Sequence, residues 1–213
     1  SVVHPQSPAG IYLGEFLSDP HFLPQEIRFE DPYLGKGGLG GSGAQFLGAL
    51  ALTQKINKTP MDSAEALKAL DLFRKCSNPT NSLFSASGAD VVSQSMGRVC
   101  FFHGREIANS DWPINGIGFA IFRTQTKIPT HEHLSNLADF DERNLSKIVS
   151  HVWEDFSNPE VLIRGFKAYR DELIRLGLSC QASVEYCGRL ESGPGSLAAK
   201  GCGAFGADTV LVL

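Results

Sequence analysis

The sequence predicts an α+β protein built from two lobes, and three features support this fold class. Apolar residues recur at helical spacing in several segments, shorter apolar or alternating stretches have the pattern of strands, and many of the 22 glycines fall in two clusters, at 35–43 and 193–206. A chain of 213 residues with 42% hydrophobic content can form one large domain or two small ones. We expect the division near 104–111, which gives an N-terminal lobe of residues 1–105 and a C-terminal lobe of residues 106–213.

The N-terminal lobe is expected to begin with loops and to continue with two helices. Residues 1–31 are rich in proline and aromatic residues, so they predict loops with one short extended piece near 11–16. The spacing of apolar residues predicts a helix over 42–56. A second helix is predicted from Asp62 to about Cys76, because Asp62 is a suitable cap and a glutamate follows three residues later.

A loop and a strand are expected at the end of this lobe. Residues 78–87 are polar and include a proline, which predicts a loop that leads into Ser87-Gly88-Ala89-Asp90. The apolar stretch 99–103 predicts a strand. Asp90 is therefore expected where a loop meets regular structure.

The C-terminal lobe is expected to contain two amphipathic helices and three strands. Residues 116–124 alternate between apolar and polar side chains, which predicts a strand. Apolar residues at helical spacing predict one helix over 143–156 and another over 160–176, which Gly177 terminates. Two more strands are predicted near 182–187 and 209–213, with the second glycine cluster between them.

Composition excludes several classes of partner. The formal net charge is −4, and the 19 basic and 23 acidic residues are interspersed, so we expect no nucleic-acid partner and no anionic membrane surface. No apolar run reaches the roughly 20 residues that span a bilayer, and the first residues do not resemble a signal segment. A cytoplasmic protein with a small-molecule ligand is the expectation, and a homodimer is left open.

The cysteines do not indicate a disulfide framework or a zinc site. There are five of them, an odd number, and none has CxxC spacing. We interpret them as reduced thiols that lie mostly in the core.

The first glycine cluster has the composition of a phosphate-binding loop. Gly35-Lys36-Gly37-Gly38-Leu39-Gly40-Gly41-Ser42-Gly43-Ala44 runs directly into a predicted helix. Small residues allow backbone N–H groups to turn toward an anion, and a helix N-terminus adds about half a positive charge. The spacing differs from GxxxxGK[ST], and a flexible glycine-rich turn before a helix is the alternative.

Three motifs in order resemble those of the GHMP kinases, the family of galactokinase, homoserine kinase, mevalonate kinase and phosphomevalonate kinase. The stretch Gly38-Leu39-Gly40-Gly41-Ser42-Gly43-Ala44 is similar to the family's Gly-Leu-Gly-Ser-Ser-Ala-Ala signature, with glycine in place of the first serine. Ser87-Gly88-Ala89-Asp90 resembles its Ser-Gly-x-Asp, and Ala198 to Asp208 resembles its late Gly-x-Gly-Gly-Gly loop. The likeness covers nearly the whole chain.

The resemblance implies a two-lobed kinase fold, with a nucleotide-binding N-terminal lobe and a ferredoxin-like, substrate-side C-terminal lobe. ATP and Mg²⁺ would be the cofactors. The residues implied for the nucleotide are Gly37, Gly38, Leu39, Gly40, Gly41, Ser42, Gly43 and Ala44, with the Ser42 hydroxyl at the metal. Asp90 would be the catalytic residue that accepts or orients the proton of the attacking hydroxyl. From the residues alone, a turn or helix cap is the other interpretation of Asp90.

The late loop is expected to close over the acceptor through Gly201, Cys202, Gly203 and Ala204. It is looser than the family's run of glycines, because Phe205 and Ala207 occupy two positions where backbone alone is usual. Cys202 has no histidine beside it in the sequence, so we interpret it as a small filler rather than a nucleophile. His131 and His133 are interpreted as polar surface or cap residues rather than a metal pair.

The chain departs from the family pattern at its beginning. The Pro-Gly-Lys or Pro-Gly-Arg strand that opens GHMP kinases has no counterpart here, so we expect this motif upstream of Ser1. The acceptor implied is mevalonate or phosphomevalonate. Two alternatives remain: a non-catalytic relative that binds a nucleotide or metabolite, and a diphosphomevalonate decarboxylase.

Overall fold

The computed structural model describes residues 3–17, 29–30, 39–54, 60–77, 86–124, 141–203 and 209–213. Over these ranges the protein is α+β, with helices and two small antiparallel sheets. The chain divides into two compact units. The first comprises Ser1–Lys36 and Gly40–Trp112, and the second comprises Gly37–Leu39 and Pro113–Leu213.

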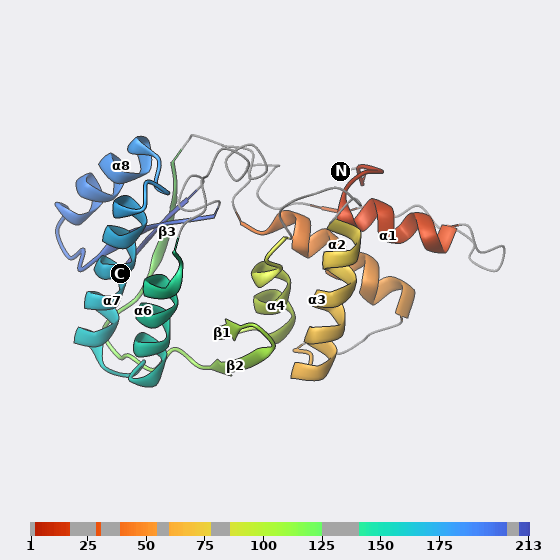
Figure 1. The fold of residues 1–213 in the computed structure, drawn as a ribbon, viewed down its shortest axis with the longest axis horizontal. Coiled ribbons are helices and arrows are strands. Elements are labelled where there is room, and N and C mark those ends of the chain that lie inside the picture. Colours follow the sequence, from red (N-terminus) through yellow and green to blue (C-terminus); the bar gives the residue numbers. More distant parts are fainter. Residues whose placement is uncertain are drawn as a thin grey trace. The chain divides into compact units, whose positions relative to one another are not determined.

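The first unit contains four described helices and a hairpin (Figure 1). Its elements are α1 (Pro8–Leu17), α2 (Gly41–Gln54), α3 (Ser63–Ser77), α4 (Ala89–Met96), β1 (Val99–His103) and β2 (Glu106–Ser110). The helices α2 and α3 and the strand β1 confirm the elements predicted at 42–56, 62–76 and 99–103. The predicted loop at 78–87 lies outside the described residues as far as residue 85.

Helix α3 begins with the capping box that the sequence predicted. The Glu65 N–H donates to Asp62 Oδ1 at 2.8 Å, and the Asp62 N–H donates to Glu65 Oε2 at 3.1 Å. Two amide groups that the first turn cannot satisfy thereby find acceptors. Short-range hydrogen bonds of this kind depend only on neighbouring residues, so the sequence was sufficient to locate this helix start.

Helix α1 corrects the prediction of loops with an extended piece near 11–16. Pro8 is the first residue of this helix, a position where its missing N–H and fixed φ favour a helix rather than break one. The Ser7 hydroxyl accepts from the Gly10 N–H at 3.1 Å and caps the first turn. Tyr12 and Leu13, together with Ala9, are buried on one side of the helix.

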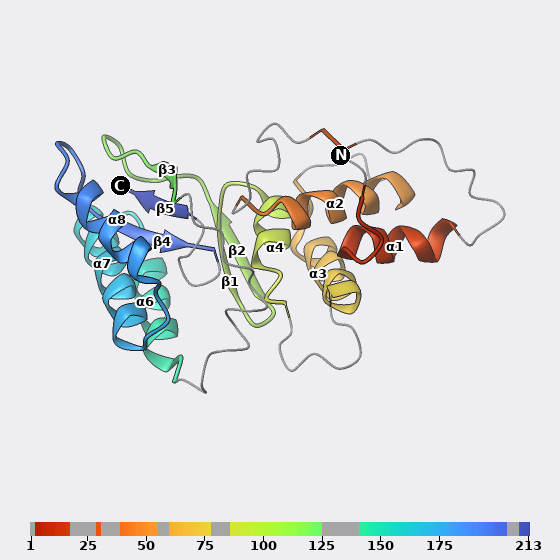
Figure 2. The same ribbon diagram turned by 90° about the horizontal axis from the view of Figure 1, so that it is seen from above.

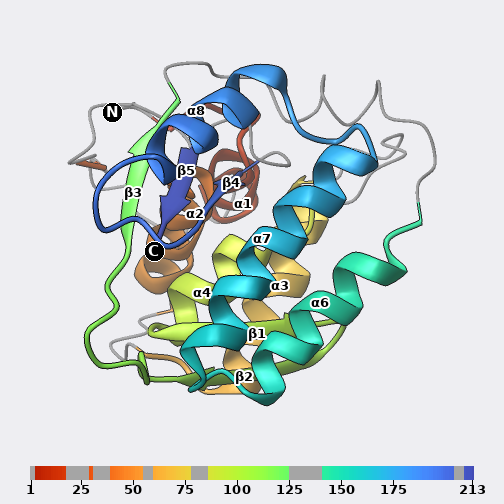
Figure 3. The same cartoon turned by 90° about the vertical axis from the view of Figure 1, so that its left-hand side faces the viewer.

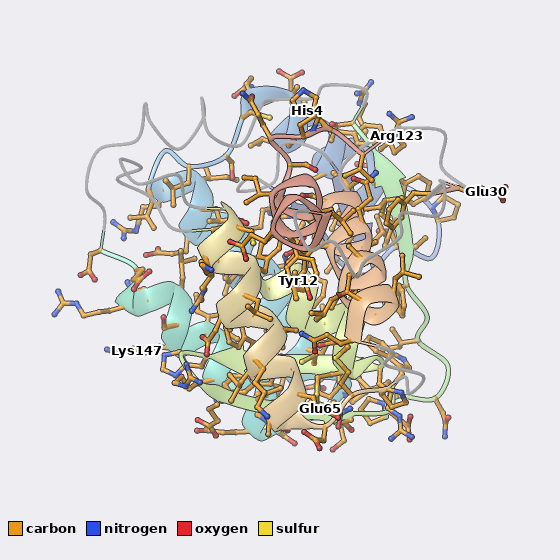
Figure 4. The ribbon with its side chains drawn as sticks, turned by 90° about the vertical axis from the view of Figure 1, so that its right-hand side faces the viewer. His4, Tyr12, Glu30, Glu65, Arg123 and Lys147 are labelled. Carbon is orange, nitrogen blue, oxygen red and sulfur yellow. The ribbon has the colours of Figure 1, made fainter. Side chains whose placement is uncertain are left out.

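The core of the first unit is centred on Phe46 of α2, whose side chain is 0% exposed. Its ring makes edge contacts with Tyr12 at 5.4 Å and with Phe73 at 5.3 Å between ring centroids. Figure 4 shows Tyr12 directed into this group of helices. A second cluster, which includes Leu70, Val92 and Met96, joins α3 and α4 to the β1–β2 hairpin. The position of α4 is therefore determined by packing on both of its sides.

The second unit pairs a three-stranded sheet with three helices (Figures 2 and 3). Its elements are β3 (Ala120–Arg123), α6 (Arg143–Glu154), α7 (Pro159–Arg175), α8 (Gln181–Glu191), β4 (Ala199–Cys202) and β5 (Thr209–Val212). The strand order is β3-β5-β4, and both pairings are antiparallel. Helices α7 and α8 pack on β4, and α6 packs on α7.

Two predicted helices and two predicted strands of this unit are confirmed. The helices are α6 and α7, and α7 ends as expected, with Gly177 at φ 70° and the Leu178 N–H donating to the Leu173 carbonyl at 2.9 Å. Strand β5 matches the prediction at 209–213, and β3 occupies the end of the segment predicted at 116–124.

Helix α8 corrects the strand predicted near 182–187. Its buried residues, Ser183 and Cys187, lie four positions apart, which is the period of a helix. Cys187 packs with Ala199 of β4 and Val210 of β5. The strand preference of Val184 and Tyr186 is therefore overridden by a helical face that covers the sheet.

Two further features of the described chain bear on the composition-based expectations. None of its helices is long and apolar enough to cross a bilayer. All five cysteines are free, and Cys76 and Cys187 are buried while the other three are half-buried. The expectation that the cysteines lie mostly in the core therefore holds for two of the five.

We predict that Phe46→Ala lowers the free energy of unfolding of the first unit by about 3–5 kcal/mol, because it empties a fully buried ring site with two aromatic neighbours. Urea denaturation followed by circular dichroism measures the change. Leu52→Ala on the same helix is the control, because Leu52 is 52% exposed and its truncation should change stability by less than about 0.5 kcal/mol. Equal effects of the two substitutions would contradict this description of the core.

Candidate active site

The N-terminus of α2 presents backbone amide groups that no described residue satisfies. The first helical hydrogen bond runs from the Ala44 N–H to the Gly40 carbonyl at 3.0 Å, so the N–H groups of Gly41, Ser42 and Gly43 precede it. No hydrogen bond of these three groups occurs within the described chain. Helices α3 and α7 differ, because Asp62 and Asn158 cap them. The start of α2 therefore keeps donors that can bind an anion.

Asp90, the predicted catalytic residue, lies directly against this helix start. A Cβ atom built on Gly43 would be 2.7 Å from Asp90 Oδ2 and 3.1 Å from its Cγ. The carboxyl group therefore touches the Gly43 backbone, and any side chain at position 43 would collide with it. Two motifs far apart in the sequence, the glycine loop and Ser87-Gly88-Ala89-Asp90, come together here, although the sequence did not predict the helix α4 that carries Asp90.

Gln94 fixes the distance between the two motifs. Its Nε2 donates to the Gly40 carbonyl at 3.0 Å, and Gly40 has φ 71°, a conformation that favours glycine. Gln94 follows Asp90 by one helical turn, so both side chains lie on the face of α4 that meets α2. Gln94 was not among the residues predicted from the sequence. The signal that could have revealed it is this four-residue spacing, which has meaning only once α4 is known to be a helix.

The surroundings of Asp90 favour the protonated form of its carboxyl group. Burial raises the pKa of Asp90 above its usual range, and it outweighs the lowering effect of the backbone N–H groups of Val91 and of Asp90 itself. A carboxylate with a raised pKa is a stronger base than an exposed aspartate. Such a shift in a residue that adjoins unsatisfied amide groups is typical of a functional site.

Arg74 of α3 holds the segment that leads into α4. Its Nε donates to the Ala86 carbonyl at 3.3 Å, and one terminal nitrogen donates to the Ser87 carbonyl at 2.8 Å. The guanidinium group also lies over the Phe102 ring, 5.9 Å from the centroid. Gly88, which follows Ser87 in this segment, has φ 68°, and a Cβ atom there would be 2.2 Å from Leu70 Cδ1. Arg74 was not among the predicted site residues, because its role arises from the contact of α3 with this segment.

The remaining predicted nucleotide-loop residues are only partly described. Gly37 and Gly38 lie outside the described residues. Leu39 is described as a bend, and Ser42 and Ala44 are exposed in the first turn of α2. The Ser42 hydroxyl has no partner within the described chain, so it is available to a ligand.

The predicted substrate-side loop is corrected in part. Gly201 and Cys202 belong to strand β4, where they pair with Val210 and Thr209 of β5, so they are not loop residues. Gly203 follows the strand with φ 70°, and Ala204 lies outside the described residues. The strand forms here because the small residues fit beneath α7 and α8, which cover β4. Cys202 Sγ accepts a hydrogen bond from Lys200 Nζ at 3.5 Å.

The oxygen donors of the candidate site suit a Mg²⁺ ion that also binds phosphate and water better than they suit a metal ion bound by protein side chains alone. Among the described residues, no group of three or more His, Cys, Asp or Glu side chains could hold a metal ion. The site offers the Ser42 hydroxyl and the Asp90 carboxyl, which are hard oxygen ligands. Mg²⁺ commonly takes one or two protein oxygens and completes its shell with phosphate oxygens and water. His131 and His133 lie outside the described residues.

Comparisons of the chain with protein-family models, with curated proteins and with solved structures give no match. The function is therefore inferred from the residues and their geometry.

We predict that Asp90→Asn raises the free energy of unfolding at pH 7. Since the folded protein holds its Asp90 proton more tightly than the unfolded chain, stability falls as the pH rises from the ordinary aspartate pKa, about 3.9, to the raised folded value. The increase in the free energy of unfolding should shrink below about pH 4, where the Asp90 carboxyl of the wild type is protonated as well. Denaturant titrations at several pH values measure it. If Asp90→Asn is less stable than wild type at pH 7, the raised pKa is contradicted. Asp71→Asn is the control, because Asp71 is exposed.

We predict that Arg74→Gln loosens the segment before α4 while the core persists, because both hydrogen bonds to the carbonyls of Ala86 and Ser87 are lost. Amide hydrogen exchange at residues 86–91 should accelerate by about tenfold, given roughly 1.5 kcal/mol for a hydrogen bond from a charged donor. Lys75→Gln is the matched control, because Lys75 is exposed and bonds only to Glu15 among the described residues. Unchanged exchange in the Arg74 variant would show that the arginine does not hold this segment.

Proposed function

We propose that the protein is an ATP-dependent small-molecule kinase of GHMP type that phosphorylates a mevalonate-pathway metabolite, mevalonate or phosphomevalonate. The observation that supports this most directly is the contact of the Asp90 carboxyl with Gly43, beside the open amide groups of α2. Groups that bind phosphate oxygens and a residue that accepts or orients the proton of the attacking hydroxyl both assist phosphoryl transfer, and this contact supports a proposal in which the two act together. The choice of family and acceptor rests on the sequence resemblance.

The amide groups at the start of α2 would bind phosphate oxygens of ATP. The N–H groups of Gly41, Ser42 and Gly43 precede the first helical hydrogen bond, and the helix dipole adds to their attraction for an anion. Because residue 43 is glycine, the Asp90 carboxyl can approach the same backbone. The Ser42 hydroxyl would serve as a ligand to Mg²⁺, which supplies positive charge to the phosphates during transfer.

Asp90 would act as the proton acceptor. The acceptor hydroxyl gives its proton to the Asp90 carboxylate while its oxygen forms a bond to the γ-phosphorus, and the bond between that phosphorus and the ADP oxygen breaks. The raised pKa makes this carboxylate a better base than an exposed aspartate would be. Gln94 and Arg74 would position the two reacting elements, since one binds the glycine loop and the other binds the segment before α4.

The ferredoxin-like description of the second lobe stays a prediction. In the described residues of the second unit, one strand is followed by three helices and two strands, with β5 central in the sheet. Nucleotide or metabolite sensing without turnover, and decarboxylation of a diphosphorylated mevalonate, remain the alternatives that the same resemblance suggests.

We predict that Asp90→Asn lowers kcat by at least about 10²-fold, the low end of the usual contribution of a positioned base, and leaves the protein folded. The assay follows ADP release from ATP·Mg²⁺ with mevalonate, phosphomevalonate, homoserine or galactose supplied separately. Ser42→Ala should raise the Mg²⁺·ATP concentration needed for half-maximal rate. Asp71→Asn, an exposed carboxylate of the same unit, is the control and should keep wild-type turnover.

Each outcome of this assay is informative about the proposal. Full turnover in the Asp90 variant would overturn the assigned role. If wild type binds ATP but releases no ADP with any of the acceptors, the sensor is favoured. Release of CO₂ from a diphosphorylated acceptor would identify the decarboxylase.

A further inference from the structure

A small pocket lies in the second unit between the end of β3 and helix α8. It has a volume of about 270 Å³ and is lined by Arg123, Thr124, Ala182, Glu185, Tyr186 and Arg189. Two of these side chains carry a positive charge and one carries a negative charge. Two others, Thr124 and Tyr186, bear hydroxyl groups.

The two arginines of this pocket differ from the other described arginines. Those others each donate to, or form an ion pair with, a carboxylate or carbonyl oxygen of the chain: Arg74, Arg98, Arg105, Arg143, Arg164, Arg170 and Arg175. Within the described chain, Arg123 and Arg189 have no such acceptor. The guanidinium groups that lack an acceptor thus line the same pocket.

Both arginines are attached to rigid elements. Arg123 is the last residue of β3, where it pairs with Thr209 of β5, and Figure 4 shows it at the end of that strand. The Arg189 guanidinium lies over the Tyr186 ring, 5.3 Å from the centroid, and Tyr186 packs against the cluster of Cys187, Ala199 and Val210. A cation–π contact of this kind helps to hold the guanidinium in place, and its N–H groups donate no hydrogen bond in this contact and can donate to a ligand.

Glu185 does not neutralise the arginines in this arrangement. It lies one helical turn before Arg189, yet its Oε1 accepts from Gln181 Nε2 at 2.9 Å. The ion pair that the spacing would allow is absent within the described chain, and the Arg189 guanidinium lies over the Tyr186 ring instead. The pocket therefore keeps a net positive charge.

We propose that this pocket binds a phosphate group. Guanidinium groups match phosphate oxygens with paired N–H donors, and two of them suit a group that carries about −1.5 to −2 charge at pH 7. The Tyr186 hydroxyl adds a donor for a remaining oxygen. The phosphate has two sources, a free inorganic ion or the phosphomonoester of a metabolite. The site is independent of the kinase activity proposed above.

The test is a titration of the full chain with inorganic phosphate and with methyl phosphate at constant ionic strength, observed by ¹⁵N–¹H NMR and calorimetry. We expect saturable shifts at the amides of Thr124 and Arg189. Arg123→Gln and Arg189→Gln should each weaken binding by at least about fivefold, and Glu185→Gln should strengthen it. Tighter binding of methyl phosphate would identify a metabolite as the source, and equal affinity would identify the free ion.

Three controls keep this proposal open to refutation. Arg175→Gln should bind as wild type does, because Arg175 is paired with Glu172 and lies outside the pocket. In Asp90→Asn the shifts at the Thr124 and Arg189 amides should follow the wild-type titration, whatever happens at residues 41–43, because Asp90 belongs to the other unit. If a glutamine variant misfolds, Arg123→Lys and Arg189→Lys replace it and should still weaken binding. Shifts confined to residues 41–43, or acetate binding as tightly as phosphate, would overturn the assignment.

Discussion

The candidate site of the first unit depends on the close approach of the Asp90 carboxyl to the Gly43 backbone. The start of α2 meets the start of α4 at this contact, and a side chain at position 43 would force the Asp90 carboxyl to move. Val91, the residue after Asp90, is 0% exposed, so the helix that carries the carboxylate is fixed by the core. The unsatisfied amide groups of α2 and the half-buried carboxyl are therefore held together by packing rather than by a direct bond between them.

Several features around this contact are unfavourable for stability, which is common at functional sites. Gly40 and Gly88 adopt left-handed backbone conformations, the start of α2 has no side-chain cap in the described chain, and burial raises the pKa of Asp90. The surrounding structure offsets these costs. Arg74 binds the segment before α4, and Gln94 binds the Gly40 carbonyl.

The two units would attract an anion by different means under the proposals made above. In the first unit the attraction comes from backbone amide groups and a helix dipole, which need no charged side chain. In the second it comes from Arg123 and Arg189, whose charges lack a carboxylate partner in the described chain. The formal net charge of the chain is −4, so attraction for an anion depends on such local arrangements and not on overall charge.

The sequence by itself determined the features that depend on neighbouring residues. The capping box of α3, the end of α7 at Gly177, the amphipathic helices and the candidate residues Ser42 and Asp90 were all readable from local patterns. Tertiary structure decided the rest. Helix α8 forms because its Ser183 and Cys187 face covers a sheet, and Gln94 and Arg74 gain their roles from α2, α3 and α4 meeting. Contacts between distant segments leave no local pattern, because their partners are chosen by packing of the whole unit.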